Sequence, residues 1–201
     1  MYQYSIYNGG ITREQFLFYE TKITAMLLCQ GYDKESIINK ITEANLYQFP
    51  TERMVKSIAN GCWRRLEALE NCELIECLAT SSIEVAKQIN LYAMMRYNRI
   101  VWDFMVTVVG EKYRTQDYSF SKKDVHIFLN RLREQVDGIS DWTDETMKKI
   151  AQVLIKCLVE CGYLENAKSE VLLPVSLCPE LENGMRSNGD QSAFSAFNYF
   201  E

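Results

Sequence analysis

Two sets of basic and amide side chains, each at helical spacing, are the residues of this chain best suited to bind nucleic acid. The first set occupies one face of a stretch that has no acidic residue between positions 53 and 66. Its members are Arg53, Lys56, Asn60 and Arg64. The members of the second set are Lys148, Lys149, Gln152 and Lys156. Lys and Arg neutralise phosphates, and amide side chains bond to phosphates or base edges, so both sets predict contact with double-stranded DNA. The alternative is that each set is only the solvated face of a surface helix.

A third set of cations lies in the most apolar part of the chain. Arg96 and Arg99 fall on the narrow polar strip of a long apolar segment, close to Asp103. Both are included among the candidate DNA contacts. Ion pairing between the two halves of the protein is nevertheless the favoured explanation, because Arg99 and Asp103 are spaced i,i+4 and can pair on one helix face.

The cysteines and the single histidine do not form a pattern typical of catalysis or metal binding. The seven cysteines include no CxxC pair, and His126 is the only histidine. Cys157 and Cys161 fall on an apolar helix stripe, where reduced cysteine packs as a small hydrophobic side chain. The sequence therefore predicts no catalytic residue, no metal site, no cofactor and no small-molecule substrate. A catalytic thiol is a remote alternative that would need a cysteine next to His126.

Charge and hydropathy limit where the protein can be located and which partners it can bind. The formal net charge is −5, but residues 163–201, with six acids and two bases, account for −4 of it, so residues 1–162 carry only −1. Local basic patches rather than the total charge then decide whether phosphates bind. No apolar run approaches the roughly 20 residues of a membrane span, and the N-terminus lacks the basic start and apolar core of a signal peptide. We therefore expect a soluble, cytoplasmic protein with no membrane partner.

Helix-capping signals and apolar periodicity predict that helices carry all of these side chains. Between prolines 50 and 174 the chain is free of that helix breaker. A cap residue precedes nearly every apolar-periodic segment. The expected helices cover residues 13–30 (capping box Thr12 and Gln15, end at Gly31), 34–44 (cap Asp33), 52–69 (cap Thr51), 83–111 (capping box Ser81 and Glu84), 121–135 (capping box Ser121 and Asp124) and 144–161 (cap Thr143 or Asp141, end at Gly162).

The predicted fold class is mainly all-α, with two helical lobes of helix-turn-helix or winged-helix character. The first lobe covers residues 1–80, although the loop before its basic helix is longer than a tight helix-turn-helix allows. The second covers residues 81–182, with helix 83–111 as its spine and residues 163–165 and 170–173 paired as a small β-hairpin wing. Residues 183–201 form a polar tail whose aromatic side chains are expected to dock on another surface. A short strand or an extended arm is expected through Tyr2, Tyr4 and Ile6.

Several residue combinations resemble the BrxA family, small proteins encoded in bacterial BREX phage-exclusion cassettes. The resemblance spans about residues 10–180. It rests on Gly10, Tyr19-Glu20-Thr21, Asn45-Leu46-Tyr47-Gln48, Thr51-Glu52-Arg53, Tyr92-Ala93, Arg96-Tyr97-Asn98-Arg99, Asp103-Phe104, Glu111-Lys112-Tyr113, Asp117-Tyr118, Trp142, Thr146, Lys148-Lys149, Leu154, Gly162 and Leu164. The resemblance implies a two-lobed, all-α protein with helix-turn-helix character that binds DNA in a defence apparatus. That apparatus also holds an ATPase, a DNA methyltransferase and a phosphatase-like protein. The resemblance does not imply an enzyme.

Two functions from different classes are consistent with these observations. The leading hypothesis is a non-catalytic subunit of an anti-phage BREX system that contacts duplex DNA mainly through phosphates. The alternative is a protein-interaction adaptor of the same defence complex that does not bind DNA directly. The arrangement of the basic side chains distinguishes the two hypotheses, because DNA binding favours one continuous positive surface over unconnected spots.

Overall fold

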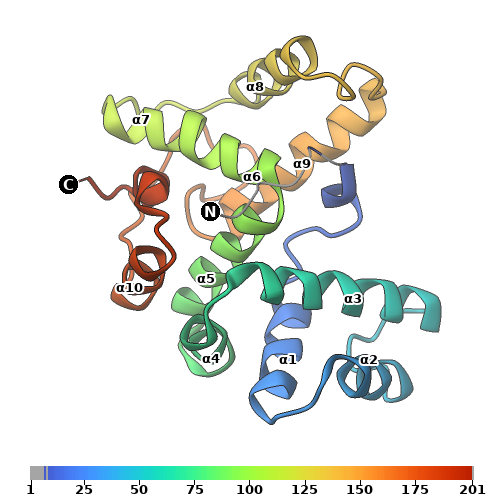
Figure 1. The fold of residues 1–201 in the computed structure, drawn as a ribbon. Helices are drawn as coiled ribbons and strands as arrows, with labels where there is room; N and C mark the ends of the chain where they lie inside the picture. The colour runs from blue at the N-terminus through green and yellow to red at the C-terminus, as the bar shows by residue number, and fades with distance from the viewer. Residues whose placement is uncertain (1–6, 8, 201) are drawn as a thin grey trace.

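The chain folds almost entirely into helices. The structure, a computed structural model, describes residue 7 and residues 9–200 (Figure 1). The strand or extended arm predicted through Tyr2, Tyr4 and Ile6 lies outside the described residues. The helical elements are η1 (Gly9–Thr12), α1 (Phe18–Cys29), α2 (Lys34–Glu43), α3 (Glu52–Leu69), α4 (Cys72–Thr80), α5 (Ile83–Tyr97), α6 (Arg99–Phe104), a π-helical turn (Met105–Gly110), α7 (Glu111–Arg114), α8 (Lys122–Gln135), α9 (Asp144–Glu160), α10 (Pro179–Ser187) and η3 (Gln191–Phe197). The mainly all-α prediction is therefore confirmed.

Helix starts follow the cap residues at most of the predicted positions. The Asp33 carboxylate accepts a hydrogen bond from the Ser36 amide at the start of α2. Thr51 and Thr143 cap α3 and α9 in the same way, and the predicted capping box of Ser121 and Asp124 forms at α8. These bonds satisfy amide groups that otherwise lack a partner in the first turn of a helix. At α5 the cap is one residue later than predicted, at Ser82.

The first predicted helix begins five residues later than expected. Thr12 does not cap a helix at residue 13, because its hydroxyl donates back to the Gly9 carbonyl and closes the short turn η1. The chain then runs without helical structure to Leu17, which has a left-handed φ of 44° directly before α1. Residues 13–17 thus form a linker between η1 and α1. The predicted capping box of Thr12 and Gln15 is wrong.

The predicted spine helix is broken at Asn98. This residue has extended backbone angles, φ −132° and ψ 113°, and its side chain accepts a hydrogen bond from the Ile100 amide. Asparagine side chains compete with the helical backbone in this way, so a new helix starts instead of the old one continuing. The segment then passes through α6, the π-helical turn and α7. Residues 83–111 therefore form a succession of helices instead of a single one.

The predicted β-hairpin wing is not present in the described part of the chain, which contains no strand. Residues 170–172 pair with residues 118–120 instead, where an isolated antiparallel bridge joins Ser119 and Val171. The amide of Leu172 donates to the Tyr118 carbonyl at 2.8 Å. Helix-turn-helix character is not supported either, because residues 44–51 precede α3 and residues 136–143 precede α9. Each connection is longer than the three or four residues of a helix-turn-helix motif.

Two hydrophobic clusters hold the helices together. The smaller cluster joins α2 to α3 through buried side chains such as Ile37, Ile41 and Val55. The larger cluster is formed by side chains of the other helices, of the end of α3 and of η3, whose Phe194 and Phe197 are buried. Phe194 and Phe197 thus dock on the protein itself, next to the π-helical turn and α7 (Figure 1), whereas Phe200 is exposed.

Gly110 at the end of the π-helical turn is required by the close approach of η3. A Cβ atom at this position would lie 2.5 Å from the Ser195 hydroxyl oxygen and 3.1 Å from its backbone carbonyl carbon. The backbone atom cannot rotate away, so we expect Gly110→Ala to destabilise the fold by about 1–3 kcal/mol. Urea denaturation measures this effect, and Thr107→Ala, in the same turn but exposed, is the control. Equal unfolding midpoints for the two variants would show that η3 does not pack there.

Candidate nucleic-acid interface

The first basic surface is the exposed face of α3. Apolar residues at positions 55, 59, 62 and 66 are buried and orient this helix. Arg53, Lys56 and Arg64 are exposed on its other side, while Asn60 is half-buried and donates to the Lys56 carbonyl at 2.8 Å. Arg64 also forms an ion pair of 2.7 Å with Glu14. Among the described residues, no carboxylate forms an ion pair with Arg53 or Lys56.

The second basic surface is the exposed face of α9. Buried positions 147, 150, 154 and 157 orient this helix, so that Lys148, Lys149, Gln152 and Lys156 are exposed. Three of them, with Thr12 and Gln15, line a hollow of about 450 Å³ between α9 and the N-terminal segment. The ammonium group of Lys156 donates to the Gln15 side-chain oxygen at 3.2 Å. None of the three lysines pairs with a carboxylate in the described part of the chain.

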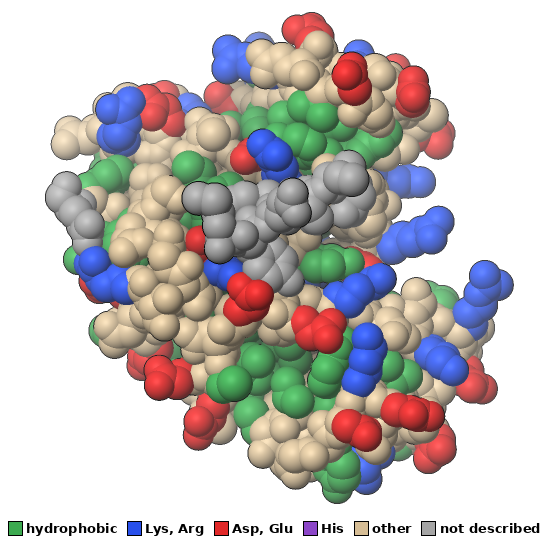
Figure 2. Space-filling view, viewed as in Figure 1, with side chains coloured by type: hydrophobic (Ala, Val, Ile, Leu, Met, Phe, Trp, Pro, Cys, Tyr) green, Lys and Arg blue, Asp and Glu red, His purple; other side chains and the backbone are tan. Residues whose placement is uncertain are grey.

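The linker of residues 13–17 brings the two basic surfaces together. Glu14 contacts Arg64 of α3, and the next residue, Gln15, contacts Lys156 of α9. Consecutive Cα atoms are about 3.8 Å apart, so one short segment spans the space between the two helices. Figure 2 shows Lys and Arg side chains along the right-hand edge of the molecule, over both α9 and α3. The arrangement is closer to one positive surface than to two separate spots.

Arg65 fixes the linker from the inside of the protein. Only 1% of this residue is exposed, and its guanidinium group donates to the carbonyl oxygens of Glu14, Gln15 and Phe16 at 2.9, 2.8 and 2.6 Å. It also lies 3.4 Å from the Asn90 side-chain oxygen. Arg65 is not among the candidate residues predicted from the sequence. Its position on the apolar side of α3, three residues after Cys62 and one before Leu66, is the signal that marks it as buried.

Arg96 does not contribute to the surface. It is 5% exposed, and its guanidinium group pairs with Glu70 at 2.8 Å and with Asp190, while donating to the Ala68 carbonyl. The predicted contact between Arg96 and DNA conflicts with this burial, and no local pattern indicates that Asp190, 94 residues away along the chain, pairs with Arg96. Arg99 pairs with Asp103 at 3.3 Å, which is the i,i+4 ion pair that the sequence favours for this residue.

The buried cysteine thiols are poorly suited to nucleophilic chemistry. Burial raises the pKa of Cys157 to about 12, and burial also raises the pKa values of Cys62 and Cys161. A thiol is nucleophilic as the thiolate, so these groups stay protonated and unreactive at neutral pH. His126 is exposed on α8 and makes no hydrogen bond to a cysteine in the part of the chain described. No group of His, Cys, Asp and Glu side chains suited to a metal ion occurs there either.

These observations define a class of helical protein in which two basic helix faces lie on either side of a short anchored linker. The chain belongs to the BrxA family, whose model matches residues 5–189. It is 32% identical over 168 residues to a protein of Bacillus cereus called BREX protein BrxA, a match that covers 84% of each chain. It is 24% identical over 176 residues to BREX protein BrxA of Escherichia coli, covering 88% of this chain and 82% of that one.

A solved structure shows the same fold. The crystal structure of an uncharacterised protein from Magnetospirillum magneticum superposes with a TM-score of 0.82 at 24% identity, covering 95% of this chain and 97% of that one. In the described residues of the present chain, no helix combines the length and the apolar character that crossing a membrane requires.

Proposed function

We propose that this protein is a non-catalytic DNA-binding subunit of a bacterial BREX anti-phage system. Family membership supports the defence role, since the relatives in Bacillus cereus and Escherichia coli are called BREX proteins. The proposal places the protein in the cytoplasm, where it would meet phage DNA and the ATPase, methyltransferase and phosphatase-like protein of the system. The high pKa values of the buried thiols support a role without covalent catalysis.

One observation carries the DNA-binding part of the proposal. Arg53, Lys56, Lys148 and Lys149 are exposed and have no carboxylate partner in the described chain, although acidic residues outnumber basic ones. Some cations in other regions are paired with carboxylates, for example Lys87 with Glu160 at 3.0 Å, whereas these four cations keep their charge at the surface. A net negative protein that presents four such cations on two adjacent helix faces has a local surface suited to phosphates.

The contacts that we propose are to the DNA backbone. Lys and Arg at the surface of a helix bind phosphates without reading the sequence. Reading bases needs an element that enters a groove, and neither a helix-turn-helix nor a wing is present in the described residues. Gln152, beside Lys149 in the hollow, is the side chain best placed for a base contact. We therefore expect weak sequence preference.

Binding to a duplex of random sequence is expected to weaken steeply with salt. Each neutralised phosphate contributes about −0.9 to the slope of log affinity against log salt concentration. With about four or five contacts, affinity should fall on the order of a hundredfold between roughly 50 and 200 mM salt. Fluorescence anisotropy with a labelled duplex measures this slope at constant pH. A duplex of unrelated sequence serves as the control and should give the same slope.

Two outcomes would contradict the proposal. Undetectable binding at roughly 50 mM salt would favour the adaptor hypothesis, because phosphate contacts are strongest at low salt. Binding with a slope near zero would show that the cations of α3 and α9 do not neutralise phosphates.

A further inference from the structure

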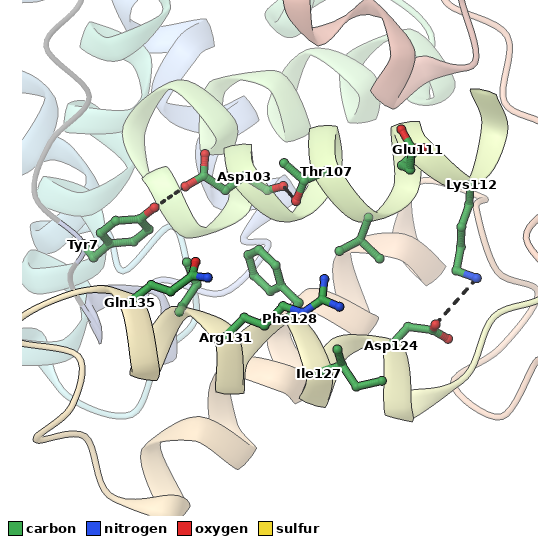
Figure 3. A pocket seen from close by; sticks show the side chains of 12 residues that line it. Tyr7, Asp103, Thr107, Glu111, Lys112, Asp124, Ile127, Phe128, Arg131 and Gln135 are labelled. Carbon is green, nitrogen blue, oxygen red and sulfur yellow. Dashed lines mark hydrogen bonds and ion pairs between the residues drawn. The ribbon is translucent and has the colours of Figure 1, made fainter. Parts of the chain in front are cut away.

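A groove separates α8 from the α6, π-helical and α7 segment, on a different part of the molecule from the basic faces of α3 and α9. Its volume is about 690 Å³. Its floor is apolar and is formed by Val108, Phe128 and Leu132. Ile127 lies at its rim with 51% of its surface exposed, although it is a large aliphatic residue. Figure 2 shows hydrophobic side chains at the surface in the hollow below α8, and Figure 3 shows the lining residues. We call this feature the α6–α8 groove.

Most charges around the α6–α8 groove are already neutralised. Asp103 pairs with Arg99 at 3.3 Å and accepts a hydrogen bond from Tyr7, whose pKa is raised to about 12 by burial and by this bond. Asp124 lies 3.6 Å from the ammonium group of Lys112. Each of these carboxylates is balanced by a neighbouring cation, so together they present little net charge to a ligand.

Arg131 is the exception among the charges that line the groove. Its side chain extends into the groove between the two helices in Figure 3. It is exposed, and it forms no ion pair with any carboxylate of the described residues. An arginine beside an apolar floor presents a planar fork of donors that matches a carboxylate. A partner that fits the groove would therefore supply one negative group for Arg131 and one apolar surface for the floor.

Nucleic acid is a poor occupant of this groove. Arg131 is the only lining cation without an ion pair in the described residues, so most phosphates of a nucleic acid would find no partner and would cover an apolar floor. The dimensions fit a peptide helix better. The lining residues span positions 103–112 on one side and 124–135 on the other, which is about 14–17 Å at a rise of 1.5 Å per residue. About three turns of helix have that length.

We propose that the α6–α8 groove binds an amphipathic helix of another BREX protein, whose apolar side chains cover Phe128 and Ile127 and whose Asp or Glu side chain pairs with Arg131. Amphipathic helices are recognised in this way, by apolar anchors spaced i, i+3 or i+4, and i+7. The proposal rests on the assignment to a BREX system made above, but it does not depend on DNA binding. Both surfaces can be occupied at once, so the protein would connect DNA to a second subunit.

Site-specific cross-linking tests this proposal in the assembled system. In cells that express the complete set of BREX proteins, a photoreactive amino acid is introduced at Ile127. The matched control carries it at Lys123, which is on the same helix but does not line the groove. We expect position 127, and not position 123, to cross-link to a helical segment of one other BREX protein that contains an acidic residue. Cross-linking to a second copy of this chain, to its own N-terminal residues, or to nothing would overturn the proposal.

A charge exchange tests the pairing of Arg131. Arg131→Glu should reduce the amount of that BREX protein recovered with an affinity-tagged chain about tenfold or more, and replacing the cross-linked acidic residue by Arg should restore it. Arg131→Glu should retain the melting temperature and the DNA affinity of the parent, because Arg131 is exposed and lies outside the basic surface. Unchanged recovery with Arg131→Glu, or no rescue by the reciprocal change, would contradict the inference. If the parent protein does not bind DNA, that result would instead contradict the proposed function.

Discussion

Reversing the charge of Arg53 and Lys56 together is expected to lower the affinity for duplex DNA by on the order of tenfold to a hundredfold at about 100 mM salt, because two phosphate contacts are replaced by repulsion. The double variant Lys149→Glu with Lys156→Glu should have a similar effect through α9. If one duplex lies across both faces, each double variant should also flatten the salt dependence, by roughly 0.9 in slope for every contact removed. Anisotropy titrations at three or more salt concentrations measure both quantities.

The choice of variants follows from the contacts of each residue. Arg64 is left unchanged because Glu at that position would face Glu14, its present ion-pair partner. The control is Lys123→Glu with Lys168→Glu, which alters the net charge equally but changes exposed residues outside both faces. Exposed substitutions typically change the stability by only about ±0.5 kcal/mol, so all variants should melt like the parent. If the control weakens binding as much as the others, overall charge and not these two helices governs the interaction.

Replacing Arg65 by Met is expected to destabilise the protein by about 3–5 kcal/mol, since the loss of a buried donor costs about 1–3 kcal/mol for each acceptor left unsatisfied. The carbonyl oxygens of Glu14, Gln15 and Phe16 all accept from this guanidinium group. Met fills a similar volume and tests the hydrogen bonds more than the packing. For a chain of this length the melting temperature should fall by roughly 10 °C, measured by calorimetry.

Two further variants distinguish a role in hydrogen bonding from a role in charge. Arg65→Lys keeps the charge but loses the planar fork of donors, so its melting temperature should lie between those of the parent and Arg65→Met. Arg53→Met, a change of the same type on the exposed face of α3, should leave the melting temperature within about 2 °C, which corresponds to roughly 0.5 kcal/mol. If Arg65→Met melts like Arg53→Met, the guanidinium group does not hold the linker.

The helix starts were the most predictable part of the fold, because a cap is a local interaction between residues three positions apart. Asp33, Thr51 and Thr143 are read directly from the chain as residues that accept a bond from a first-turn amide. The apolar stripes of α3 and α9 likewise determine which side chains face solvent, so the basic faces follow from periodicity. Both inferences depend only on neighbours along the sequence.

The features that were mispredicted depend on partners distant in sequence. Residues 163–165 and 170–173 have strand-like composition, but the Ser119 region provides a competing edge for Val171. Arg96 falls on the polar strip of its helix, but that strip is covered by Glu70 and Asp190. A periodic pattern identifies a polar face without showing whether solvent or another segment meets it.

The position of Asp190 has a consequence for how the chain is made. Its carboxylate accepts hydrogen bonds from Arg96 and Tyr92, and the contact with Tyr92 joins positions 98 residues apart. Synthesis adds about 5–20 residues per second, so α5 emerges from the ribosome several seconds before the partner that covers its arginine. During that interval the nascent chain exposes the apolar surface that η3 later buries. Ribosome-bound chains that end shortly before residue 190 should therefore be the species most prone to capture by chaperones.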